Sequence, residues 1–272
     1  MSRLSVHSIL LLACSLAWGD TVYNDPVTEI SSGGTLNYYE ISWGTNAAWS
    51  PTDLGDDLTV WFDGSDWTTM WVDTGSLTNS TPGDGVIVWD NKATTNNHAG
   101  HGSKYPSLST NSFSAGAVYF ASSKVLAFAI DVTQAVTNDV FIVADTTSTP
   151  TGWVYPIARD GTGCLPFFGT SGNPQKPLVY GANTDAIWTT SVTRKAIFLW
   201  RVDGTDTAVN VDNGTEVTDA TGTATRTVWT HICTNVAAHS PLVHIAEILI
   251  INNLSTADRA KVWTYLENKW GL

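Results

Sequence analysis

The chain has 272 residues, of which 43% are hydrophobic and 14% are charged, so it can bury one sizeable core and is most simply one main domain. Its net charge of -12, with only 13 lysines and arginines, argues against a nucleic acid as partner, because phosphate binding needs clustered positive charge. Three cysteines, Cys14, Cys164 and Cys233, allow at most one bridge and exclude a disulfide framework.

Residues 1–50 differ from the rest of the chain in their pattern of apolar and polar residues. Arg3, an apolar run at 9–18 and the small residues Ala17 and Gly19 resemble a secretory signal peptide, and the surroundings of Cys14 weakly resemble a lipoprotein box. The apolar run is too short to span a bilayer comfortably. We expect the segment to be retained as an N-terminal arm that contacts other protein subunits, because an exposed apolar run promotes association. Export with cleavage of the leader is the alternative.

From residue 51 onward the pattern predicts short strands separated by turns. Strands are predicted at 125–131 and 140–145, and residues 196–202 alternate so that their even-numbered apolar side chains share one face. Asp203-Gly204 then leads to a strand at 207–211. Asn213-Gly214 leads to another at 215–218, because both residues of such a pair tolerate the positive φ of a hairpin turn. Many short strands with Gly-rich loops indicate an all-β sandwich.

The last residues predict a buried strand at 245–252 and a helix over 255–269. Ser255 is suited to cap this helix, and Asp258 lies at its positive end. One helical face is apolar and is predicted to lie on a sheet; it comprises Val262, Trp263, Leu266 and Trp270. In the strand, Glu247 alternates with apolar residues on one predicted face, namely Val243, Ile245, Leu249 and Ile251. We expect Glu247 to be a buried, partnered carboxylate, since an unpaired buried charge would be costly.

This C-terminal pattern resembles the concanavalin A-like (laminin-G-like) jelly-roll sandwiches, whose marine bacterial and phage members often end in "EILIYN", "LS", a helix and "YL..KWGL". The present chain has EILIIN at 247–252, Leu254-Ser255, Tyr265-Leu266 and KWGL at 269–272. Segments at 57–63, 86–92, 105–108 and 117–120 also match in the family's order, so the resemblance covers roughly residues 51–272. It implies a two-sheet antiparallel jelly-roll sandwich with a short C-terminal α-helix, behind the arm of residues 1–50. It also implies a structural role for Glu247.

The resemblance does not fix the function, because this sandwich serves as lectin, glucanase, adhesion module and virion part. The family's glucanases carry a Glu-x-Asp-x-x-Glu pattern that places carboxylates on one cleft. The pattern does not occur in this chain, nor does a nucleophile elbow or a phosphate loop. We therefore expect no catalytic residues and no enzyme.

Metal and glycan candidates lie in polar turns. Calcium prefers oxygen ligands, and the turns with Asp63, Asp66, Asp203 and Asp206 could contribute to a site at the rim, although ordinary Asp-Gly turns also explain them. His98 and His101 could hold a transition metal only with a third ligand from elsewhere. Sugars are held by aromatic faces and planar polar groups, and the glycan candidates in Gly/Asn/Asp-rich loops are Trp153, Tyr155, Tyr180, Asn183, Asp185 and Trp188. Packing in the fold is their alternative role.

Three functional hypotheses follow. The first is a non-catalytic, lectin-like structural or attachment protein on a virion surface, of the capsid decoration or fibre type, which could bind cell-surface or environmental glycans. The second is a secreted or surface-anchored bacterial carbohydrate-binding protein, which rests on the leader-like N-terminus. A glycoside hydrolase is the third and the least favoured by the sequence.

Overall fold

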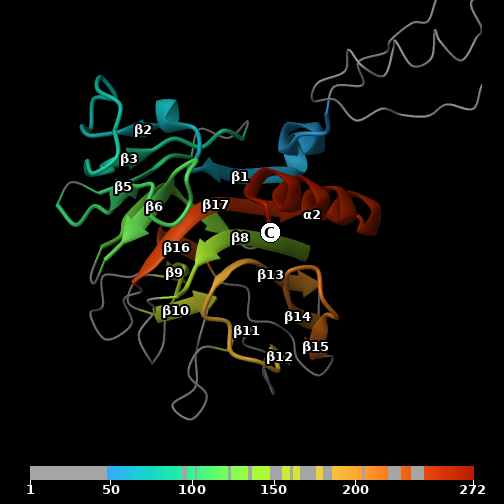
Figure 1. The fold of residues 1–272 in the computed structure, drawn as a ribbon. Helices are drawn as coiled ribbons and strands as arrows, with labels where there is room; N and C mark the ends of the chain where they lie inside the picture. Colours follow the sequence, from blue (N-terminus) through green and yellow to red (C-terminus); the bar gives the residue numbers. More distant parts are fainter. Residues whose placement is uncertain are drawn as a thin grey trace, which may run out of the picture. The chain divides into compact units, whose positions relative to one another are not determined.

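The protein is described by a computed structural model over residues 48–93, 97–101, 103–121, 124–133, 137–147, 155–159, 162–165, 176–179, 186–203, 206–219, 228–233 and 242–272. These residues belong to a unit that spans Ala47–Leu272. The predicted N-terminal arm lies outside the described residues except for Ala48, Trp49 and Ser50. The predicted all-β sandwich with two antiparallel sheets and a C-terminal helix is confirmed (Figure 1).

The first sheet contains eight strands within the described residues. In spatial order they are β15 (Val217–Asp219), β14 (Asp206–Val211), β13 (Lys195–Asp203), β8 (Thr137–Asp145), β17 (Val243–Asn252), β6 (Ala117–Phe120) and β5 (Ser107–Ser109), and β1 (Leu58–Asp63) also pairs with β17. β6 pairs with the first residues of β17 and β1 with later ones, while β8 pairs along nearly its whole length. β17 therefore lies in the middle of the sheet, as its apolar sequence predicts.

The second sheet faces the first and contains seven strands within the described residues. They are β10 (Thr162–Leu165), β9 (Ile157–Arg159), β16 (Val228–Ile232), β7 (Leu126–Thr133), β4 (Ala99–Gly100), β3 (Val88–Trp89) and β2 (Met70–Trp71). A short pair, β11 (Leu178–Val179) with β12 (Ala186–Ile187), and two 3-10 turns, η1 (Pro51–Asp57) and η2 (Trp67–Thr69), complete the described β region. Phe62 and Trp200 of the first sheet and Trp89 and Trp229 of the second belong to one buried core.

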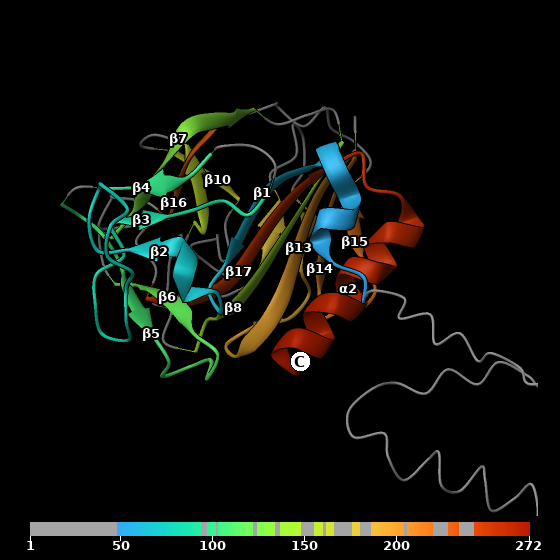
Figure 2. The ribbon, with the colours of Figure 1, turned by 90° about the horizontal axis from the view of Figure 1, so that it is seen from above.

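A second core lies between the first sheet and helix α2 (Thr256–Trp270), which runs along the sheet's outer face (Figure 2). Ser255 caps the helix: its Oγ accepts the Asp258 amide at 3.1 Å, as the sequence predicts. Trp263 is 3% exposed and meets Phe141 of β8 edge-to-face, with ring centroids 5.3 Å apart. Among the described residues, no helix has the length and apolar character needed to cross a membrane.

The sequence predicts that the odd-numbered side chains of β17 share one face of the sheet, and this is correct only for the second half of the strand. The register with β8 shifts between Ile245 and Glu247, so Ala246 is an additional residue that forms a bulge. An additional residue reverses the alternation of side chains. Val243 and Ile245 consequently lie in the core between the sheets, whereas Leu249 and Ile251 pack beneath α2, on the face where Glu247 meets the helix.

Candidate functional site

Glu247 is the centre of a buried polar network that joins α2 to the first sheet. Its Oε1 accepts hydrogen bonds from Trp61 Nε1 at 2.7 Å and from the Tyr265 hydroxyl at 2.8 Å. Its Oε2 accepts from Trp270 Nε1 at 2.6 Å and lies 2.9 Å from Lys269 Nζ. Glu247 is 0% exposed, so these contacts replace its lost water. The structure thus has Glu247 as the partnered, buried carboxylate that the sequence predicts.

A second carboxylate lies opposite Glu247, because Asp63 is its register partner on β1. Lys269 Nζ is 2.7 Å from Asp63 Oδ1 and therefore bridges the two carboxylates. Lys92 Nζ lies 2.9 Å from Asp63 Oδ2 and 2.9 Å from Asp66 Oδ2. The cluster contains three carboxylates and two ammonium groups.

The surroundings move the pKa values of the two facing carboxyls in opposite directions. Burial raises the pKa of Glu247, and the charge of Lys269 opposes this only in part. Burial also acts to raise the pKa of Asp63, but Lys269, Ser65 and Lys92 together outweigh it, and the pKa is lowered. Two carboxyls with separated pKa values are a feature of acid/base sites.

A substrate cannot reach Glu247 and Asp63 in this structure, which argues against an acid/base role for the pair. Retaining glycosidases hold two carboxyls about 5 Å apart, with the sugar between them. Here the ammonium of Lys269 occupies the space between the two groups, and the rings of Trp61 and Trp270 donate to Glu247. No face of Glu247 is open to a substrate, since the residue is 0% exposed.

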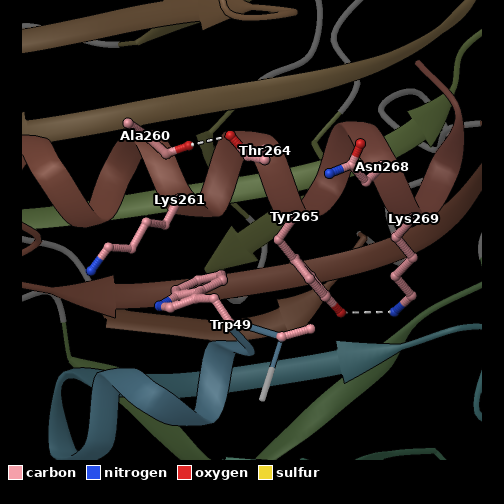
Figure 3. Close-up of a pocket in the computed structure, with 8 residues that line it drawn as sticks. Trp49, Ala260, Lys261, Thr264, Tyr265, Asn268 and Lys269 are labelled. Carbon is pink, nitrogen blue, oxygen red and sulfur yellow. Dashed lines mark hydrogen bonds between the residues drawn. The ribbon is translucent and has the colours of Figure 1, made fainter. Parts of the chain in front are cut away.

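A pocket of about 560 Å³ opens directly beside this network (Figure 3). Trp49 forms one side and meets Tyr265 edge-to-face, with ring centroids 5.9 Å apart. The other lining residues come from Ala48 and from successive turns of α2: Ala260, Lys261, Thr264, Asn268 and Lys269. Tyr265 and Lys269 thus belong both to the pocket wall and to the buried network, through the 3.0 Å bond from Lys269 Nζ to the Tyr265 hydroxyl oxygen.

The pocket offers aromatic faces together with unused polar groups. Within the described residues, neither Trp49 Nε1 nor the Asn268 side-chain amide has a hydrogen-bond partner, and Asn268 is exposed. An amide both donates and accepts, and an indole N–H donates. Lys261 Nζ is 2.9 Å from Asp258 Oδ1, so its charge is locally balanced. This combination suits an uncharged ligand rich in hydroxyl groups.

The glycan candidates predicted from the sequence do not line this pocket in the described part of the chain. Trp153, Tyr180, Asn183 and Asp185 are outside the described residues. Tyr155 is buried, and the ring of the half-buried Trp188 packs against the core between the sheets. The described residues do not bring these candidates together in a site.

Several of the metal candidates are engaged by other protein groups. Asp63 and Asp66 share Lys92, and Asp203 and Asp206 are backbone register partners in the β13–β14 hairpin. His98 is exposed, while His101 Nδ1 accepts the amides of Ser103 and Lys104. The described residues hold no group of three or more His, Cys, Asp or Glu side chains arranged to bind a metal ion.

Cys233 is the cysteine whose side chain the structure describes, and it is a buried free thiol. Burial raises its pKa well above the ordinary value, so it stays protonated and unreactive. Cys14 and the side chain of Cys164 lie outside the described residues.

Sequence reasoning missed the pocket because its residues follow a second helical stripe. The apolar stripe of α2 predicts the contact with the sheet. The pocket residues Lys261, Tyr265 and Lys269 recur every four residues on a neighbouring stripe of the same helix. A stripe that mixes an aromatic with long polar side chains is the signal for a partly buried helix flank. Trp49 could not be placed from the sequence, since its contact with Tyr265 spans most of the chain.

No family model matches the chain, and no curated protein matches it. Among solved structures, it is similar to a GH54 α-L-arabinofuranosidase variant soaked with 4-nitrophenyl α-L-arabinofuranoside (TM-score 0.50, 8% identity, 76% of this chain and 58% of that chain). It is also similar to Trypanosoma rangeli sialidase (TM-score 0.48, 12% identity, 78% of this chain) and spans 33% of the sialidase chain.

The similarity to the arabinofuranosidase shows a shared β-rich fold, and at 8% identity it shows the fold alone. It also corrects one prediction. The expectation that the chain is no enzyme is contradicted, because the similar arabinofuranosidase is a glycoside hydrolase and its fold therefore supports catalysis in that protein. The missing Glu-x-Asp-x-x-Glu pattern excludes only one arrangement of catalytic carboxylates.

Proposed function

We propose that this chain is a carbohydrate-binding sandwich of the concanavalin A-like type that attaches its carrier to glycans. The carrier is a virion on whose surface the protein is exposed, and a bacterium that secretes or displays the protein is the alternative. The two-sheet fold and the C-terminal sequence pattern support the family assignment. The acidic net charge favours glycans over nucleic acids as ligands.

The observation that carries this proposal is the pocket formed by Trp49, Tyr265 and Asn268. An aromatic face covers the apolar face of a sugar ring, and an adjacent free amide can both donate to and accept from its hydroxyl groups. Tyr265 is held in place by Glu247, so the pocket wall is ordered before a ligand arrives. Pre-ordering of this kind lowers the entropic cost of binding.

A glycan array followed by calorimetric titration tests the proposal. Trp49→Ala and Asn268→Ala should each weaken binding of the selected oligosaccharide by about tenfold or more, which corresponds to about 1.4 kcal/mol. Trp188→Ala serves as the comparison, because Trp188 was a sequence candidate and packs on the core. Loss of binding in Trp188→Ala with full binding in Trp49→Ala would move the site to the loops predicted from sequence. No binding to any glycan would reject the proposal.

Glycoside hydrolysis is a second candidate, favoured by the fold shared with the arabinofuranosidase. Release of reducing sugar from the glycans that bind would establish it. Glu247→Gln and Asp63→Asn should then impair folding more than turnover per folded molecule, because both carboxylates are enclosed. Turnover abolished in a fully folded Glu247→Gln protein would instead assign Glu247 to catalysis.

Residues 1–50 are proposed to join the domain to other subunits of its carrier. Deletion of residues 1–46 removes most of this arm but keeps the pocket residues Ala48 and Trp49, and it should leave a folded domain that no longer enters the assembly. The intact mass of the natively produced protein distinguishes the two settings, since loss of about twenty residues is expected of a cleaved signal peptide. Normal assembly of the shortened protein would reject the arm's role.

A further inference from the structure

A row of polar side chains crosses the first sheet away from the pocket described above. The backbone registers pair Tyr119 of β6 with His244 of β17, His244 with Asp145 of β8, and Asp145 with Lys195 of β13. Their neighbours in sequence, Val118, Ile245, Ala144 and Ala196, all belong to the core between the sheets. Alternation along the strands therefore places the four polar side chains on the outer face.

The row is preorganised by one contact between its own members and by contacts with adjacent residues. The rings of Tyr119 and His244 stack with centroids 4.5 Å apart. Asp145 is fixed by the Ser112 hydroxyl at 2.5 Å and by the Thr147 amide at 2.9 Å. Lys195 Nζ lies 5.1 Å from the centre of the Phe113 ring. Each of the four side chains is thus held by a neighbour.

Much of the row's hydrogen-bonding capacity is unused within the described residues. There the Tyr119 hydroxyl and the His244 ring nitrogens have no hydrogen-bond partner, and Lys195 Nζ has no carboxylate partner. Burial lowers the pKa of His244, so near neutral pH its ring presents one donor and one acceptor. Asp145 stays ionised, because hydrogen bonds from Ser112 and Thr147 outweigh the effect of burial and lower its pKa.

The order of these groups indicates the ligand. Donors and acceptors alternate along the row, so an anion placed on Lys195 would also face Asp145, whereas hydroxyl groups can satisfy both kinds of group. Neighbouring strands lie about 4.8 Å apart, so four strands span roughly 14 Å. That length suits two or three linked sugar units lying across the strands.

We propose that Tyr119, His244, Asp145 and Lys195 form a second binding site, which takes an uncharged oligosaccharide. This inference rests on the proposed glycan-binding function and extends it to a second position on the outer face of the first sheet, apart from the pocket. Two sites on one domain would strengthen attachment to a polysaccharide through multivalency, without any change at the pocket.

Titration with cellohexaose, laminarihexaose and an oligogalacturonate of equal length tests this on the full chain. For a neutral hexaose that binds, we expect two sites per chain. Tyr119→Phe should weaken one site by several-fold, because it removes only the hydroxyl. The double variant His244→Ala/Lys195→Ala should reduce the stoichiometry to one, and Trp49→Ala should abolish the other site. Tyr105→Phe is the matched control, since Tyr105 is a half-buried tyrosine outside the row.

The outcomes separate the two proposals. A single site that is lost in Trp49→Ala and unchanged in the double variant overturns the second site and leaves the pocket intact. A single site lost in the double variant and unchanged in Trp49→Ala supports the row and overturns the pocket. Binding of the oligogalacturonate in preference to both neutral sugars overturns the proposed ligand class, and no binding by any of the three overturns both proposals.

Discussion

The Tyr265 hydroxyl donates to Glu247 Oε1 at 2.8 Å, and this bond joins α2 to the middle of β17. The ring of the same tyrosine meets Trp49 at the pocket. One side chain thus connects the buried carboxylate with the candidate binding surface. A substitution of Glu247 should therefore lower the free energy of unfolding, and it should also alter the pocket through the position of Tyr265.

Glu247→Gln should lower the free energy of unfolding by about 1–3 kcal/mol. Every partner of Glu247 is a donor, so the amide NH₂ of glutamine would face a donor where Oε1 or Oε2 now accepts. Urea unfolding measures the effect. Glu267→Gln on the same helix is the control and should stay within about 0.5 kcal/mol. Equal stability of the two variants would contradict the role given to Glu247.

The two facing carboxyls should give stability opposite dependences on pH. The pKa of Glu247 is raised above its ordinary 4.5, so its contribution is fully present below that pH and is lost as the pH rises through the native pKa. The pKa of Asp63 is lowered from 3.8, so its contribution is present above 3.8 and is lost as the pH falls through the native value.

Unfolding curves of the wild type and two variants from pH 3 to 8 check these signs. The stability of the wild type relative to Glu247→Gln should fall as the pH rises above 4.5. Its stability relative to Asp63→Asn should fall as the pH drops below 3.8. Comparison with variants removes the contributions of other groups. Difference curves with the reverse slopes would contradict the raised pKa of Glu247 and the lowered pKa of Asp63.

Arg259→Ala should destabilise the domain strongly, by about 3–5 kcal/mol. Arg259 Nε and Nη2 bind the two oxygens of Asp139 at 2.9 and 3.2 Å, and Asp139 is 0% exposed. Removing the guanidinium leaves a buried carboxylate without its main partner. Arg259→Lys should recover part of the loss, because it keeps the charge but not the paired geometry. Arg194→Ala is the control: its side chain is 59% exposed, and its loss should cost about 1 kcal/mol or less.

Local sequence signals were sufficient for most of the fold. The alternation at 196–202 predicts β13, and the Ser255 cap with the apolar stripe predicts α2, because both patterns repeat over short distances. The bulge at Ala246 could not be read, since the run from Ile245 to Ile251 is almost wholly apolar and fits either facing. Only pairing with β8 reveals the additional residue.

The candidate site was less accessible to sequence reasoning. Glu247 could be recognised as a structural carboxylate, but its partners Trp61 and Asp63 lie more than half the chain away in sequence. Loop composition favoured Trp188 as a glycan candidate; its half-buried ring packs against the core, and most of the other loop candidates lie outside the described residues. Sites built from distant strands and from helix flanks depend on tertiary register, which local periodicity does not encode.

The turn between β14 and β15 should depend on the backbone preference of Asn213. Asp212 and Asn213 have φ values of 50° and 55°, whereas Gly214 does not have a positive φ, so the left-handed pair lies one residue before the Asn213-Gly214 pair predicted from the sequence. The turn is also tied to β13, because the Asp212 amide donates to Ile197 O at 2.9 Å and the Ile197 amide to Asp212 Oδ1 at 2.7 Å. These two hydrogen bonds hold the turn in register, so the hairpin cannot shift to avoid the left-handed conformation.

Asn213→Ala should lower the free energy of unfolding by about 1–2 kcal/mol, because a Cβ without a compensating polar group is strained in the left-handed conformation. Asn213→Gly should retain the stability of the wild type to within a few tenths of a kcal/mol. Thermal and urea unfolding of both variants measure the difference, and an alanine variant as stable as the glycine variant would show that the turn does not require the left-handed conformation.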